Sequence, residues 1–285
     1  MRVYIIADME GATGVVHRAD LGEAGTHHYH RACRWLTGDV NAAVQGAVSE
    51  GATEVVVSEG HAHMRNIRLD ELHEAARLVR GPARWESRPL CQAAGLDASF
   101  ALAFFVGFHT KAGTPRGLLS HTWAGAIVQS IHLNGREVGE TAINAALCGH
   151  YGVPVGLVTG ADDVVREARA DLGDVEVACV KDAMGFDVAS CLPPKRTHRL
   201  IADAAGRAVA RAKSGAFSPQ TLPSPVVAAL RVHRREMADK MSLVPGLERV
   251  GPVALRVEAP DAMTAISTLW RAITEAFREP AAWLR

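Results

Sequence analysis

The chain has 285 residues, enough for about two domains of ordinary size or for one large α/β domain. Hydrophobic residues make up 48% of it and charged residues 22%, values that are typical of a globular protein and exclude a disordered chain. The 31 basic side chains balance the 31 acidic ones, so the chain lacks the positive field that attracts nucleic acids and anionic membranes. We therefore expect a protein that binds neither nucleic acid nor a membrane.

Apolar runs and cysteine usage indicate the compartment. No stretch approaches the roughly 18 apolar residues of a membrane-spanning helix. The N-terminus reaches a carboxylate at Asp8, which is too early for a secretory signal. The five cysteines are scattered and form no C-x-x-C pair, a usage typical of free thiols in a reducing compartment. The sequence therefore favours a soluble, cytoplasmic protein.

Strands and helices alternate through the first half of the chain. An opening strand over residues 1–8 is followed by an amphipathic helix over 29–50, a β-branched strand over 54–58, a helix over 69–79 and an apolar strand over 101–108. This alternation predicts an α/β fold with a mainly parallel sheet that is covered by helices.

The second half continues this alternation and then changes character. The Asn134-Gly135 turn between two apolar runs predicts a hairpin, and Pro193-Pro194 interrupts the pattern. We therefore predict an α/β domain over residues 1–195 and a smaller C-terminal α+β module over 196–285. Further predicted helices cover 139–149, 197–213 and 261–277, and further strands cover 154–159, 175–180, 226–232 and 253–257.

Carboxylates and histidines follow three of the predicted strands. Asp8 and Glu10 come after the first strand, His61 after the second and His109 after the third. Ligands of open parallel sheets bind beyond these carboxyl ends. Two carboxylates so close repel each other unless a cation neutralises them or one is protonated, as in an acid–base pair. The imidazoles favour the cation, because imidazole and carboxylate are common zinc ligands, and an aspartate can bridge two ions.

A simpler interpretation stays open at this point, in which Asp8 caps the following turn and the histidines are exposed. Elsewhere the sequence contains no dinucleotide-binding glycine motif, no phosphate-binding loop and no nucleophile elbow. His27, His28 and His30 have no carboxylate at ligand spacing, so we interpret them as solvated. His63 is interpreted as a bystander of the His61 site.

A series of short motifs resembles the zinc-dependent D-aminopeptidase family. The resemblance covers about the first 195 residues closely and the remainder loosely. Its motifs occur in the family's order: Asp8-Met9-Glu10-Gly11, Asp39-Val40-Asn41-Ala42-Ala43, Gly60-His61, Gly107-Phe108-His109, Leu119-Ser120-His121, Asn134 to Glu140 with Asn144, and Gly160-Ala161-Asp162-Asp163. In one departure, Glu59-Gly60 precedes His61 where the family usually has Asp-Ser.

The resemblance implies two zinc ions per subunit and a ring-like homodecamer. It implies these metal ligands: Asp8 as the bridge, Glu10, His61, His109 and Glu140. Glu140 by itself is only an acid near a helix start, where the helix dipole favours it. His121 matches the family's catalytic histidine, although from its residue type alone it is equally a loop histidine that packs or caps. Such a histidine can relay a proton to a departing amine.

These observations predict a metal-dependent aminopeptidase that releases N-terminal residues, D-amino acids in particular, from short peptides. Two alternatives remain open. One is a different amide or ester hydrolase that uses the same two-metal site, since loops rather than ligands determine specificity. The other is a non-catalytic metal-binding assembly protein that retains the ligands but has lost turnover through Glu59 or an altered loop.

Overall fold

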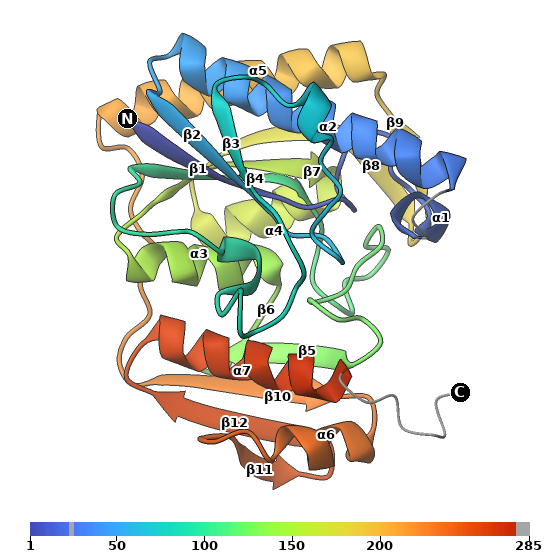
Figure 1. The fold of residues 1–285 in the computed structure, drawn as a ribbon, viewed down its shortest axis with the longest axis vertical. Coiled ribbons are helices and arrows are strands. Elements are labelled where there is room, and N and C mark those ends of the chain that lie inside the picture. Colours follow the sequence, from blue (N-terminus) through green and yellow to red (C-terminus); the bar gives the residue numbers. More distant parts are fainter. Residues whose placement is uncertain (23–25, 278–285) are drawn as a thin grey trace.

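The computed structural model describes residues 1–22 and 26–277 and is built on two β-sheets (Figure 1). The larger sheet has the strand order β3-β2-β1-β4-β7-β8-β9. All neighbours in it are parallel except β8 and β9. Its strands are β1 (Arg2–Ala7), β2 (Glu54–Glu59), β3 (Ala76–Val79), β4 (Leu102–Phe108), β7 (Val155–Ala161), β8 (Glu176–Gly185) and β9 (Val188–Cys191).

Helices cover both faces of this sheet. One face is packed by α2 (His27–Ser49) and α5 (Pro194–Lys213), the other by α3 (Glu140–His150) and α4 (Asp162–Leu172). In β1, Val3 and Ile5 face α2 and α5, whereas Tyr4 and Ile6 face the opposite core. Because both faces are buried, the central strands are continuously apolar rather than alternating.

The smaller sheet is antiparallel, with the order β11-β12-β10-β5-β6. Helix α7 packs on β10 and β12 and also contacts α3 of the larger layer (Figure 1). The elements of this part are β5 (Val128–Leu133), β6 (Arg136–Val138), β10 (Val226–Val232), α6 (Arg235–Met241), β11 (Glu248–Gly251), β12 (Ala254–Ala259) and α7 (Ala262–Phe277). The prediction of an α/β fold with a mainly parallel sheet and a smaller α+β part is thereby confirmed.

The predicted helix over 69–79 is wrong. A short 3₁₀ helix (Leu69–Glu71) is followed by the edge strand β3, which pairs with β2 in parallel. Asn41 of α2 takes the backbone groups that a helix would need: its Nδ2 donates to Glu71 O at 2.7 Å, and its Oδ1 accepts from His73 N at 2.8 Å. The remaining short elements are α1 (Arg18–Leu21) and a second 3₁₀ helix (Cys91–Ala93).

The two predicted domains are connected more closely than a boundary at residue 195 implies. Hairpin β5–β6 lies in the smaller sheet, and α5 packs against α2 of the larger layer. The division into 1–195 and 196–285 stays a prediction. All five cysteines are free thiols. No helix of the described residues is long and apolar enough to cross a membrane.

Candidate metal centre and active site

The register of the larger sheet brings three strand ends to one edge. Ala7, the last residue of β1, lies opposite Glu59 of β2 on one side and Val106 of β4 on the other. Asp8, His61 and His109 therefore leave neighbouring strands at nearly the same level. The sequence prediction that these strand ends converge is confirmed in this arrangement.

Two glycines allow the loop after β1 to lie close to the end of β4. The N–H of Gly11 donates to Gly107 O at 2.8 Å. A Cβ atom on Gly11 would lie 1.8 Å from Phe108 O, and one on Gly107, whose φ is +76°, would lie 2.1 Å from Asp8 O. Only glycine fits at such close backbone approaches. This contact places the Asp8–Glu10 segment beside His109.

The five residues predicted as metal ligands form one buried cluster. His61 Nδ1 lies 3.6 Å from Asp8 Oδ1 and 3.0 Å from Glu10 Oε1. His109 Nε2 lies 3.6 Å from Asp8 Oδ2 and 3.3 Å from Glu140 Oε1. Two groups of potential ligand atoms result, Asp8 with Glu10 and His61, and Asp8 with His109 and Glu140. Asp8 belongs to both and presents a different oxygen to each histidine.

The histidines are oriented by backbone carbonyls. His109 Nδ1 lies 3.0 Å from Thr110 O, and His61 Nε2 lies 3.4 Å from Leu21 O. A carbonyl accepts only from a protonated nitrogen, so the opposite nitrogen of each ring is the one that presents a lone pair to a metal when the ring is neutral. Among the described residues, His109 Nε2 is buried without a hydrogen-bond partner. The imidazoles and carboxylates of the cluster together form a donor set that fits zinc.

The crowding of carboxylates controls the charge of the cluster. Burial and the neighbouring charge of Glu10 raise the pKa of Asp8 to about 7. Burial acts to lower the pKa values of His61 and His109. The negative charge of Glu10 beside His61, and that of Glu140 beside His109, outweighs burial and raises both pKa values well above their usual range. All three pKa values are raised, so Asp8, His61 and His109 hold their protons more strongly than usual. The cluster therefore favours positive charge at its centre.

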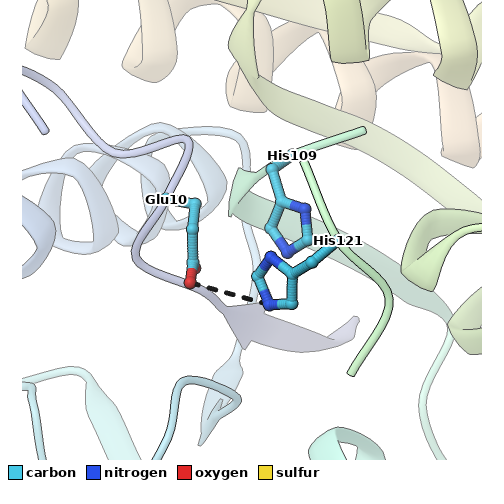
Figure 2. A group of neighbouring side chains, drawn as sticks. All are labelled: Glu10, His109 and His121. Carbon is cyan, nitrogen blue, oxygen red and sulfur yellow. Dashed lines mark ion pairs between the residues drawn. The ribbon is translucent and has the colours of Figure 1, made fainter. Parts of the chain in front are cut away.

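His121 lies at the edge of the cluster and faces the cavity. Figure 2 shows its ring face to face with His109 and opposite Glu10; the two ring centroids are 4.2 Å apart. Its Nε2 lies 3.8 Å from both Glu10 Oε1 and Glu140 Oε1, and its Nδ1 lies 2.9 Å from Leu119 O. Burial and the charge of His109 lower the pKa of His121, so the ring is neutral and able to accept a proton at Nε2.

The same geometry also allows His121 to ligate a metal. Glu10, His109 and His121 form a third group of potential ligand atoms. His121 is nevertheless less buried than the other two histidines, with a quarter of its side-chain surface exposed. An imidazole that reaches both the acidic cluster and solvent has the position that proton transfer requires.

Gln92 supports the cluster and was not predicted from the sequence. Its Nε2 donates to Asp8 Oδ2 at 3.1 Å and to Glu140 Oε2 at 2.6 Å. Asn144 fixes the amide by donating to Gln92 Oε1 at 2.6 Å. The amide thus orients two carboxylates of the ligand set. A lone glutamine in a one-turn 3₁₀ helix has no spacing signal by which it could have been found.

Glu59 orients the loop of His61 through Asn66. The buried Glu59 carboxylate accepts from the backbone N–H of Asn66 and from its Nδ2, the latter at 3.2 Å. Asn66 Nδ2 also donates to His61 O at 2.8 Å. Glu59, the acid that departs from the family's usual residue, therefore acts on the backbone around His61.

Lys181 is a second supporting residue that sequence reasoning missed. It lies on β8 and is 1% exposed, although a strand lysine is ordinarily a surface residue. Its ammonium donates to Glu10 O at 2.8 Å, to Ala12 O at 2.7 Å and to Val15 O. Burial lowers the pKa of Lys181 to about 8. These three hydrogen bonds fix the loop that carries Glu10.

A cavity of about 1050 Å³ opens beside the cluster. Its inner end contains Asp8, Glu10, His61, His121 and Glu140, and its walls include Trp123 and, from α7, Trp270. The two indole rings pack edge to face with centroids 5.6 Å apart. The smaller sheet therefore contributes one wall of the site through its helix α7.

The remaining histidines singled out by the sequence lie outside the cluster. His63 is exposed on the cavity rim and belongs to none of the potential ligand groups. His27, His28 and His30 are exposed on the first turns of α2, as predicted.

Buried carboxylates and imidazoles at the carboxyl edge of a parallel sheet are an arrangement that suits a metal-dependent hydrolase. Comparison with known proteins makes the class more specific. The family model described as D-aminopeptidase matches residues 1–271. A D-aminopeptidase of Bacillus subtilis is 31% identical over 270 residues, which are 94% of this chain and 95% of that protein.

The solved structure of the Zn-dependent D-aminopeptidase DppA from Bacillus subtilis, a self-compartmentalizing protease, has the same fold. It superimposes with a TM-score of 0.91 at 30% identity and covers 99% of this chain and 100% of its own. The chain belongs to the D-aminopeptidase family, whose members are peptidases. The predicted resemblance is thereby confirmed.

Proposed function

We propose that this protein is a metallo-aminopeptidase that holds two zinc ions per subunit and releases N-terminal D-amino acids from short peptides. The observation that carries the proposal is the pair of ligand groups that share Asp8. One ion would be held by Asp8, Glu10 and His61, and the other by Asp8, His109 and Glu140. The relative of known structure is a Zn-dependent enzyme, which supports zinc as the metal.

Zinc held by these residues would supply a Lewis acid that polarises the peptide carbonyl and lowers the pKa of water, so that hydroxide is available at neutral pH. The chain's own residues then handle protons and orientation. His121 Nε2 accepts a proton from the attacking water and delivers it to the departing amine as the C–N bond breaks. Gln92 keeps two ligand carboxylates in place throughout.

We also propose that the protein works as a cytoplasmic homo-oligomer, specifically a homodecamer. Self-compartmentalization of the relative supports an oligomer, because enclosed active sites admit short peptides and exclude folded proteins. Five free thiols support a reducing compartment. The mass of the native particle, measured by light scattering, tests the decamer against smaller assemblies.

Release of amino acid from D-alanyl-D-alanine and from L-alanyl-L-alanine tests the function. The purified enzyme is assayed before and after treatment with a chelator. We expect release from the D-dipeptide that the chelator abolishes and that added zinc restores. Release from neither dipeptide by a zinc-loaded protein would contradict the proposal and favour another amide or ester hydrolase or a non-catalytic assembly protein.

A further inference from the structure

The cavity extends from the acidic cluster to a loop that no part of the proposed mechanism uses. This rim loop comprises residues 82–87, and five of its residues line the cavity: Pro82, Ala83, Arg84, Glu86 and Ser87. It connects the end of β3 to the second 3₁₀ helix. Because the rim loop lines the same cavity as the metal centre, a substrate bound at the centre can contact it.

Arg88, immediately after the rim loop, anchors one side of it to the larger sheet. The guanidinium is buried and donates to Ser58 Oγ at 2.8 Å and to Glu59 O at 2.7 Å, both on β2. It also donates to Gly81 O at 3.2 Å, just before the loop. Both ends of the rim loop are thus tied to β2.

Helix α7 anchors the other side. Trp85 Nε1 donates to Ser267 Oγ at 3.0 Å, and the Arg271 guanidinium lies 4.5 Å from the centre of the Trp85 ring. Trp270 Nε1 donates to Arg88 O at 3.0 Å. Because the loop is held from two sides, its backbone needs little further ordering when a ligand binds to its cavity-lining side chains.

The charged side chains that line the cavity come from the buried cluster and from the exposed rim loop. The cluster contributes the carboxylates of Asp8, Glu10 and Glu140, and the rim loop contributes Arg84 and Glu86. Among the described residues that line the cavity, Arg84 is the only arginine or lysine. It is exposed, so its guanidinium is accessible from the cavity mouth. A short peptide has a matching polarity, because its scissile carbonyl lies near its amino end and its carboxylate at the other.

We propose that Arg84 binds the C-terminal carboxylate of short peptide substrates and so forms a second, specificity-determining subsite. This inference rests on the proposed aminopeptidase function. A guanidinium presents parallel N–H groups that match the two oxygens of a carboxylate, and such charge-assisted pairs are the strong ones among hydrogen bonds. The subsite favours peptides whose carboxylate reaches Arg84 when the scissile bond lies at the metal centre. Peptide amides and long peptides lack this contact.

Paired substrates and three arginine variants test the subsite. The zinc-loaded enzyme is assayed with D-alanyl-D-alanine and with its C-terminal amide. We expect the wild type to prefer the free acid, and Arg84→Ala to lower kcat/KM for the acid about tenfold or more, mainly through KM, with little change for the amide. Arg84→Lys restores part of the preference because it keeps the charge but loses the fork. Arg199→Ala, an exposed arginine on α5, retains the wild-type preference.

A binding experiment gives a readout without turnover. A dipeptide analogue whose scissile amide is reduced is titrated calorimetrically as free acid and as amide. Arg84→Ala is expected to weaken only binding of the acid. Glu86→Gln removes a negative charge from the same loop, so the preference for the acid is expected to persist or increase.

The outcomes separate this inference from the proposed function. If the wild type hydrolyses neither the acid nor the amide, the aminopeptidase proposal fails. If the wild type hydrolyses the acid and Arg84→Ala lowers both substrates equally, or neither, the subsite is overturned while the function stands. Zinc content and the thermal midpoint of Arg84→Ala are measured in parallel, so that a folding defect is recognised. If Arg84→Ala is misfolded, titration of Arg84→Lys with the acid and amide analogues tests the subsite instead.

Discussion

The larger and the smaller sheet differ in burial and in what they bring to the cavity. All seven residues of β4 are buried, because helices cover both faces of the larger sheet. In β12 of the smaller sheet, Leu255, Val257 and Ala259 are buried while the residues between them are not, because only one face is covered. The larger sheet has no free face, so the predicted metal ligands lie at its edge. The smaller sheet contributes a wall of the cavity through α7.

Catalytic chemistry and contact with the substrate are therefore assigned to separate parts of the fold. Changes at the sheet edge are expected to affect metal content and turnover. Changes in the α7 wall are expected to affect substrate affinity and stability while leaving the metal in place. Single substitutions at the sheet edge and in the α7 wall test this separation.

Replacement of His121 is expected to have the largest effect on rate. His121→Ala should lower kcat by about 10² to 10⁴-fold, the range typical of a lost general acid–base group, while the zinc content stays unchanged. Steady-state kinetics and metal analysis measure both. His30→Ala, on the exposed face of α2, serves as the control and should retain the rate. Unchanged hydrolysis by His121→Ala would show that our assignment is wrong, and loss of zinc would make His121 a ligand.

Replacement of Gln92 should have a smaller effect of the same kind. Gln92→Leu removes the donor to Asp8 and Glu140, and loss of a group that orients metal ligands typically costs about 10 to 100-fold in metal affinity or activity. Zinc titration and kcat report the loss. The matched control is Gln45→Leu, at an exposed position of α2. An activity and zinc affinity equal to those of the control would refute the orienting role.

Replacement of Trp270 tests the wall. Trp270→Leu removes the hydrogen bond to Arg88 O and the contact with Trp123. We expect a KM that rises several-fold and a free energy of unfolding that falls by about 2–3 kcal/mol, somewhat less than for truncation of a buried aromatic to alanine. Zinc content should not change. Loss of zinc from this variant would show that the α7 wall also controls metal binding at the sheet edge.

Replacement of Glu167 is expected to have the smallest effect on turnover and to act only on the pH dependence of stability. Burial raises the pKa of Glu167 to about 7, above the usual 4.5. Between these values the unfolded chain loses the proton that the folded protein keeps, so the contribution of this group to stability falls as the pH rises. Glu167→Gln does not titrate. Its stability relative to the wild type should therefore rise by at most about 3 kcal/mol between pH 4.5 and 7.5. Denaturant unfolding at the two pH values measures this rise, and a constant difference would contradict it.

Most of the larger sheet could be predicted because buried parallel strands leave apolar runs in the sequence, as in β1, β2 and β4. The exceptions are the two edge strands: β3 is short, only half-buried and lies in the segment predicted as a helix, and β9 was not predicted. The pairing of hairpin β5–β6 with β10 could not be predicted, since pairing between distant strands leaves no local pattern.

The candidate site divides in the same way. Asp8, Glu10, His61 and His109 were predicted because strand ends of a parallel sheet meet at one edge. Glu140 came only from the family resemblance, because an acid at the start of a helix is ordinary. Gln92 and Lys181 act through contacts between segments far apart in the chain, which no spacing rule describes.

The central claim is that Asp8 joins two metal ions in one centre. The most direct test is the zinc content of the purified protein and of Asp8→Ala, determined by elemental analysis after dialysis against a metal-free buffer. We expect two zinc ions per wild-type subunit and the loss of both in the variant, with its thermal unfolding still cooperative. Full retention of two zinc ions by Asp8→Ala would show that Asp8 does not bridge them.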